Sequence, residues 1–181
     1  HHPNCHLIKN GVAPEHFQKS LQKAGEIPSD LTGIITKPVI GFWGVLAPWI
    51  DFTLIEFAAD MRQNYNFVFL GTASANILKF PRRQNIFYLG PKDYENLPNY
   101  ARFFDAAIIP FQVKPVTLAA DPIKVYEYLA SGLPVVSTNL PQLKGIADIK
   151  LAEKPEEFIR YLDWAVYNGK NEEQIKIRQK F

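Results

Sequence analysis

Cysteine is almost absent from the sequence: Cys5 is the single thiol in 181 residues. This scarcity excludes a disulfide framework and any metal site built on several cysteines, and it favours a reducing cytoplasm. Long apolar runs are absent too: the apolar, uncharged stretch from Pro38 to Ile50 has only 13 residues, with two prolines and two glycines. About 20 apolar residues are needed to span a bilayer, so we expect no transmembrane segment.

Neither sign of charge dominates. The chain has 20 basic and 18 acidic side chains and a formal net charge of +2, so it lacks the broad positive field that holds nucleic acid.

Common catalytic and nucleotide-binding motifs are absent from the sequence. The patterns G-x-G-x-x-G, G-x-x-x-x-G-K-[ST], H-E-x-x-H and G-x-S-x-G are all missing. Acidic clusters suited to Mg²⁺ are missing as well, and His6 and His16 lack partners at metal-ligand spacing. We expect no metal and no other cofactor, and we place both histidines at the surface or near a hinge.

What the chain does have is enough apolar mass for a core, at 47% hydrophobic residues, arranged as short apolar runs that alternate with helical patterns. This alternation predicts a Rossmann-like α/β/α sandwich with a mostly parallel sheet. The expected strands are Cys5–Ile8, Val39–Trp43, Phe67–Leu70, Ile86–Leu89, Ala106–Phe111, Val135–Thr138 and Ile149–Ala152. The expected helices cover 54–61, 99–104, 123–131, 158–166 and 171–181.

The length predicts one domain over residues 1–181. Residues 24–37 are polar and broken by Gly25, Pro28 and Gly33, so they read as a loop or linker. We therefore divide the chain into a hinge-proximal segment, 1–37, and a core, 38–181. Because it opens within a strand-like pattern and closes on a helical pattern without a stop signal, we expect a piece of a larger protein.

One helix has both ends marked by the sequence LAADPIKVYEYLASGLPVVST. Asp121 is a suitable N-cap, Pro122 suits the first helical position, and Gly132 is suited to ending the helix. These boundaries put Lys124 in the first turn, where a cation opposes the helix dipole, and so favour a visiting anion such as phosphate. Glu127 follows three residues later on the same face. The plainer interpretation is a solvated Lys–Glu surface pair.

Two stretches, NIFYLGPKDYENLPNYARFFDAAIIPF and DPIKVYEYLASGLPVVST, resemble the carboxyl-terminal, donor-binding half of the group 1 retaining glycosyltransferases of the GT-B fold. NGVAPEHF and PVIGFWGVLAPWIDFTLIEFAADM are similar to the family's segment after the hinge and to its first strand, phosphate loop and helix. An aromatic residue and an aspartate after that strand, Trp49 and Asp51, resemble bacterial enzymes of cell-surface polysaccharide assembly.

The resemblance implies a role for each matched residue. Glu127 matches the second glutamate of the family's E-x7-E motif, which bonds the ribose of the donor, and Lys124 matches the diphosphate contact and is the expected catalytic residue. Gly44 matches the loop where the donor phosphate approaches the backbone. The implied donor-binding set is Gly44, Val45, Leu89, Gly90, Pro91, Asp121, Pro122, Ile123, Lys124 and Glu127, with the main chain from Leu89 to Lys92 reading the nucleobase.

Two departures from the family pattern leave the donor sugar open. Ala119 stands where the first motif glutamate is expected, and Val45 and Ile50 replace basic residues of the phosphate loop. Lys124, the helix N–H groups and Lys114 are then left to meet the phosphate charge.

The implied activity is transfer of a hexose-type sugar, with retained configuration, from a nucleoside diphosphate to a growing glycan or lipid-linked saccharide. The acceptor would bind through an amino-terminal domain outside this chain, so the chain alone is expected to be inactive. The expected place is the cytoplasm, including the inner face of the membrane. Two alternatives stay open: a nucleotide-sugar 2-epimerase of the same fold, and a non-catalytic module with a degenerate donor site.

Overall fold

The computed structural model describes residues 4, 6, 10–22, 25–74, 80–146, 148–169 and 171–180. The strand predicted over Cys5–Ile8 therefore lies outside the described residues. The other six predicted strands are present, and they form one sheet in the order β3-β2-β1-β4-β5-β6 with every pairing parallel. Their bounds are β1 Val39–Trp43, β2 Asn66–Leu70, β3 Ile86–Tyr88, β4 Ala106–Ile109, β5 Val135–Thr138 and β6 Ile149–Ala152. The predicted Rossmann-like fold is confirmed.

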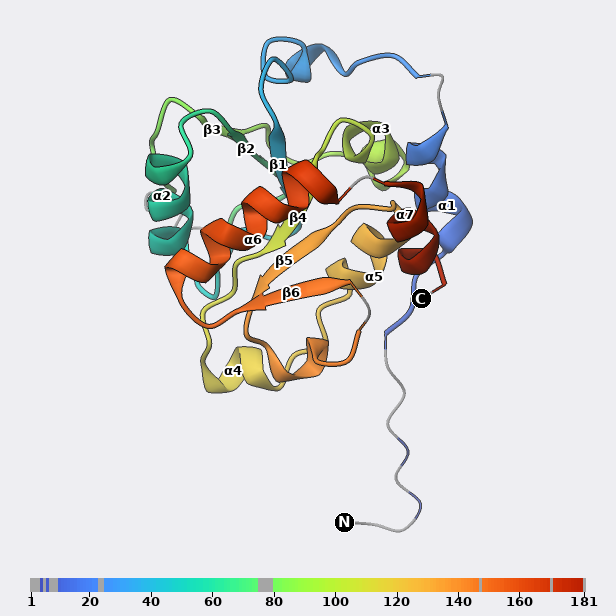
Figure 1. Ribbon diagram of the computed structural model, residues 1–181, viewed down its shortest axis with the longest axis vertical. Helices are drawn as coiled ribbons and strands as arrows, with labels where there is room; N and C mark the ends of the chain where they lie inside the picture. The colour runs from blue at the N-terminus through green and yellow to red at the C-terminus, as the bar shows by residue number, and fades with distance from the viewer. Residues whose placement is uncertain are drawn as a thin grey trace.

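Helices cover both faces of the sheet (Figure 1). α2 (Phe52–Met61) and α6 (Pro155–Asn168) pack together on one face, whereas α1 (Pro14–Gln18), α3 (Leu97–Ala101) and α5 (Lys124–Ala130) pack on the other. α7 (Glu172–Arg178) packs against α5, and α4 (Pro115–Leu118) follows β4. Among the described residues, no helix is long and apolar enough to cross a membrane. Because both faces are covered, β1 and β2 are buried at every position.

The sequence missed two short helices, α1 and α4, which with five and four residues are too short to show a clear helical period. It placed α3 two residues too late and extended β4 too far. β4 ends at Ile109 because Pro110 has no N–H to donate to a sheet.

The segment before β1 packs on the core of the sheet. Phe17 and Leu31 are fully buried, and Ile34 is 7% exposed. Residues 29–31 form one turn of 3₁₀ helix inside the stretch predicted as a loop or linker. The polar composition of this stretch concealed two buried apolar residues, Leu31 and Ile34, which attach it to the core.

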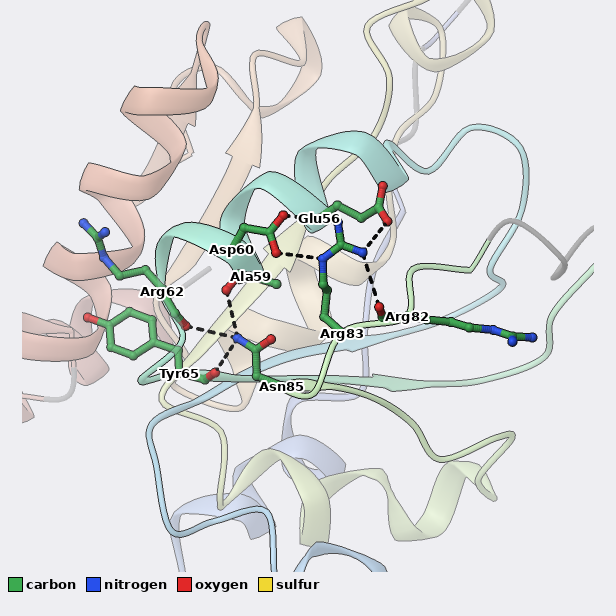
Figure 2. A network of polar contacts seen from close by, with 8 residues as sticks. All are labelled: Glu56, Ala59, Asp60, Arg62, Tyr65, Arg82, Arg83 and Asn85. Carbon is green, nitrogen blue, oxygen red and sulfur yellow. Dashed lines mark hydrogen bonds and ion pairs between the residues drawn. The ribbon is translucent and has the colours of Figure 1, made fainter.

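The edge of the sheet where β2 and β3 begin is held by polar contacts (Figure 2). The side-chain amide of Asn85 donates to three backbone carbonyl oxygens at 3.0–3.2 Å, those of Ala59, Arg62 and Tyr65. These carbonyls lie at the end of α2 and in the turn that leads to β2. Arg83 pairs with Asp60 at 2.7 Å and with Glu56 at 3.1 Å on α2, while Arg82 points away from the cluster. These contacts fasten β3 to α2 at the end of the sheet opposite the strands' carboxyl ends.

The predicted stop at Gly132 is confirmed. Gly132 has a φ of +74°, its N–H donates to Leu129, and the N–H of Leu133 donates to Tyr128, which is the Schellman arrangement.

α7 is fastened to this end of α5 by Arg178. The Arg178 guanidinium is fully buried and lies 2.5 Å from the Asp148 carboxylate and 2.8 Å from the Gly132 carbonyl. It also donates to the Gly169 carbonyl and to the Gln174 side chain. Burial lowers the pKa of Arg178, and the Asp148 charge opposes this change. The result is a fully partnered buried cation that ties the last helix to the helix carrying Lys124 and Glu127.

Candidate functional site

The candidate site lies at the carboxyl ends of β1 and β4, where α5 begins. The helix starts at Lys124, with Ile123 as an N-cap in helical conformation and no side-chain cap. The prediction that Asp121 caps the helix is wrong. Its carboxylate accepts hydrogen bonds from the backbone N–H of Asn10 (2.8 Å) and the Tyr126 hydroxyl (3.2 Å) instead. Asp121 therefore joins the segment before α1 to α5, and Lys124 is the first helical residue rather than the third.

Lys124 and Glu127 meet as the sequence spacing predicted. Lys124 Nζ lies 3.2 Å from Glu127 Oε2, and the same oxygen accepts a 2.6 Å hydrogen bond from the indole nitrogen of Trp43. The Glu127 side chain is only 7% exposed, so this is a buried carboxylate with two donors and not a solvated surface pair. Burying a charge is costly unless it is paired and hydrogen-bonded. The site thus keeps an anion and a cation together at the beginning of a helix.

A cavity of about 360 Å³ opens beside this pair. Of the implied donor-binding residues, Gly44, Val45, Pro122, Ile123 and Lys124 line it. The remaining wall is largely apolar and comes from Phe42, Trp49, Phe111, Val116, Thr117 and Ala120. Val45, which stands where the family pattern has a basic residue, is half exposed at this cavity. Among the described residues that line the cavity, Lys124 is therefore the only charged one.

Two loops that form this wall are joined by their backbones. The N–H of Asp51 donates to the Pro110 carbonyl and the N–H of Gln112 donates to the Trp49 carbonyl, both at 2.7 Å, around an antiparallel bridge between Ile50 and Phe111. Asp51 also caps α2, accepting the N–H of Leu54 at 2.9 Å. The loop after β1 and the loop after β4 are thus hydrogen-bonded side by side in the cavity wall.

Glycines let three strand ends come together at the site. Gly44 follows β1 with a φ of +146°, and Gly71 follows β2 with a φ of +126°. A Cβ on Gly71 would lie 2.0 Å from the Gly44 carbonyl oxygen, whereas a Cβ on Gly44 would lie 2.8 Å from Lys124 Cε. The N–H of Gly71 donates to the Gly90 carbonyl at 2.8 Å. Close backbone approach at these ends requires residues without side chains.

We expect Gly71→Ala to destabilise the domain, because the added methyl group meets backbone rather than a flexible side chain. The positive φ alone costs about 1–3 kcal/mol, and the clash with Gly44 adds to it. Chemical denaturation would measure the loss in the free energy of unfolding. Gly33→Ala is the matched control, since nothing lies within 4 Å of its added Cβ. An equal loss in both variants would contradict the close approach.

The structure does not bring the whole implied set into the cavity. Leu89, Gly90 and Pro91 follow β3, two strands away from β1, and reach the site through the Gly90–Gly71 backbone contact. Lys92, in the same loop, pairs with Asp30 at 2.9 Å. The predicted nucleobase loop therefore does not line this cavity, and its role in reading a base stays a prediction.

Of the residues that depart from the family pattern, Ala119 lies at the end of α4, whereas Val45 and Ile50 lie in the loop after β1. Ala119 ends this helix and is exposed, and Lys114, the other cation expected to meet phosphate, is exposed at its beginning. Thr117 lines the cavity, but its hydroxyl donates to the Gln112 carbonyl and accepts the N–H of Lys114. The α4 wall thus presents few polar groups to the cavity.

Sequence reasoning missed one aromatic pair near Glu127. His16, placed at the surface or a hinge, is buried to 9% exposure and stacks on the half-exposed Tyr94 ring, with 4.3 Å between centroids. Burial raises the pKa of Tyr94, and the charges of Glu127 and Glu95 raise it further. No spacing could have revealed a contact between residues 78 apart. Within the described residues, no group of three or more His, Cys, Asp or Glu side chains is placed to hold a metal ion.

Comparison with known proteins gives matches of two kinds. The family described as glycosyl transferases group 1 matches residues 37–166. TuaH of Bacillus subtilis (strain 168), assigned as a teichuronic acid biosynthesis glycosyltransferase, is 34% identical over 144 residues. That match covers 75% of this chain but only 34% of TuaH, so the chain spans about a third of its length.

Solved structures match over nearly the whole chain. Anabaena Alr3699/HepE, in complex with UDP and glucose, has a TM-score of 0.67 at 14% identity, covering 94% of this chain and 50% of that one. The C-terminal domain of LpcC from Francisella tularensis, a glycosyl transferase group 1 family protein, has a TM-score of 0.60 at 16% identity, covering 94% and 92%. At such low identity, these likenesses establish the fold.

Proposed function

Because the chain belongs to the group 1 glycosyl transferases, we propose that it binds the nucleoside diphosphate part of a sugar donor at the carboxyl ends of its strands. One observation carries the proposal: Lys124 and Glu127 form a pair beside a cavity whose wall contains Gly44. In this proposal, Lys124 contacts the diphosphate and Glu127 contacts the ribose hydroxyls. The UDP and glucose named with the Anabaena structure support this class of ligand.

The chemistry of the proposal is electrostatic. Breaking the bond between the sugar and the diphosphate releases negative charge, and a fixed cation at that point lowers the barrier. Lys124 supplies the cation, and its bond to Glu127 keeps the ammonium group at the cavity until the donor arrives. We propose a hexose-type sugar and retention of configuration, with no metal ion in the reaction.

We propose that the acceptor binds a part of the protein that lies outside this chain. The assignment of TuaH to teichuronic acid biosynthesis favours a growing surface glycan or a lipid-linked saccharide, assembled on the cytoplasmic side of the membrane. The acceptor would bind an amino-terminal domain, so we expect no sugar transfer by residues 1–181 alone.

The test is saturation-transfer NMR of this chain with UDP, GDP, ADP and their sugar conjugates at millimolar concentration. We expect transfer to one nucleoside diphosphate, and its loss in Glu127→Ala, because the ribose contact is removed. Glu173→Ala is the matched control, since Glu173 is exposed on α7, away from the cavity. Circular dichroism would verify that both variants fold.

Each alternative has its own outcome. Absence of transfer from every nucleotide, here and in the full-length protein, would contradict the proposal and favour a non-catalytic module. This alternative draws on Ala119, Val45 and Ile50, the residues that depart from the family pattern. If product analysis instead shows that the sugar stays attached to the nucleotide and has changed its configuration, the protein is an epimerase.

A further inference from the structure

Trp43 is the last residue of β1 and stands directly before Gly44. Its side chain is 1% exposed, and its indole N–H donates to Glu127 Oε2 at 2.6 Å, across 84 residues of sequence. An indole has a single donor and no acceptor, so this bond uses its whole hydrogen-bonding capacity. A buried Trp therefore connects the strand that ends at the phosphate loop with the carboxylate proposed to bind ribose.

The two oxygens of Glu127 have different surroundings. Oε2 accepts from both Trp43 and Lys124, while Oε1 has no hydrogen-bond donor among the described residues. Lys124 is 24% exposed and lies at the longer distance of 3.2 Å, so its ammonium group can leave for a diphosphate. The indole is buried and cannot leave. When Lys124 turns away, the bond to Trp43 remains, and Oε1 stays available for a hydroxyl group.

The indole ring is itself fixed by its neighbours. The Tyr128 ring meets it edge-on, with 4.4 Å between centroids, and the Tyr128 hydroxyl lies 3.2 Å from the backbone nitrogen of Trp43 and 3.3 Å from its carbonyl oxygen. Phe17 lies parallel to the indole at 6.0 Å. Because Tyr128 follows Glu127 on α5, two adjacent helical residues form hydrogen bonds with the last residue of β1.

From these contacts we propose that Trp43 is a positioning residue, which holds Glu127 in the orientation that reads the ribose of the donor. This inference rests on the proposed function. It adds a residue outside the donor-binding set and gives it a specific effect: Trp43 sets how strongly the site distinguishes ribose from 2′-deoxyribose.

The experiment compares Trp43→Phe with the unaltered chain of 181 residues. Calorimetry would give the dissociation constants of UDP, GDP and ADP, each paired with its 2′-deoxy analogue. A hydrogen bond to a charged group is worth about tenfold or more in affinity, so we expect at least that preference for the ribose form in the unaltered chain. In Trp43→Phe we expect the preference to fall to about twofold or less. Trp164→Phe, the same change on α6, is the matched control and should retain the full preference.

The outcomes separate this inference from the proposed function. If nucleotides bind with full ribose preference in Trp43→Phe, the positioning role is overturned and the proposed function stands. Ribose preference absent from the unaltered chain would overturn the role as well. If no nucleotide binds the unaltered chain, both fail together.

A second measurement needs no change at Trp43. The chain has three Trp residues, so a ¹⁵N spectrum should show three indole signals, assigned with Trp49→Phe and Trp164→Phe. We expect Glu127→Gln to move the Trp43 signal alone, because only that indole bonds Glu127. An unmoved Trp43 signal would overturn the inference, whether or not Trp43→Phe folds.

Discussion

If the proposed function holds, Lys124→Ala is expected to lower the kcat of sugar transfer by the full-length protein by about 10²–10³, the loss typical when one preorganised charge contact is removed. Lys124 is the single charged residue among the described residues of the cavity wall, and Val45 stands where the family pattern offers another cation, so no neighbour among them replaces the lost charge. Steady-state kinetics with a saturating donor would measure the effect. In this chain alone, weaker binding of the nucleoside diphosphate should accompany it.

The control for this prediction is Lys176→Ala. It removes the same charge from an exposed position on α7, so kcat should stay within about twofold of the unaltered enzyme, as surface changes away from a site have small effects. Equal kcat values for Lys124→Ala and Lys176→Ala would remove Lys124 from the catalytic role.

Arg178→Ala is expected to reduce the free energy of unfolding by about 3–5 kcal/mol, because removing one partner of a buried ion pair leaves the other charge uncompensated. Asp148, with a side chain only 10% exposed, would be that charge, and the carbonyls of Gly132 and Gly169 would lose their donor. Against a typical total of about 5–15 kcal/mol for a domain, this loss is large. Urea denaturation followed by circular dichroism would measure it.

Arg160→Ala serves as the matched control for this second prediction. Arg160 is 66% exposed and pairs with Glu157 at 3.2 Å within α6, and such surface pairs contribute about 0–1 kcal/mol. Similar losses in the free energy of unfolding of the two variants would show that Arg178 does not form a buried ion pair in solution.

How far the sequence predicted the fold depended on the range of the interactions. Strands buried on both faces appear as continuous apolar runs, and the bounds of Val39–Trp43 and Val135–Thr138 were predicted to the residue. The stop at Gly132 was equally local, because a positive φ favours glycine. Local rules failed at Asp121, where Asn10, 111 residues away, takes the carboxylate expected to cap the helix.

The candidate site shows the same division. The pairing of Lys124 with Glu127 follows from helical spacing, and the structure contains it. The bond between Trp43 and Glu127 joins a strand to a helix across 84 residues, and a Trp on a strand is by itself typical of a core residue. Trp43 is indeed buried, and burial concealed its polar contact. Residues that act through a buried hydrogen bond of this kind are found only when both elements are placed in space.

The backbone bridge between Ile50 and Phe111 couples two events that would otherwise be independent. A ligand that displaces the loop after β1 must also shift the segment leading into α4, or break the hydrogen bonds of Asp51 and Gln112. Each bond broken costs about 0.5–1.5 kcal/mol, so the joint movement is favoured. Under the proposed function, donor affinity and the order of α4 are therefore linked quantities, and we expect a substitution in α4 to alter binding without contacting the nucleotide.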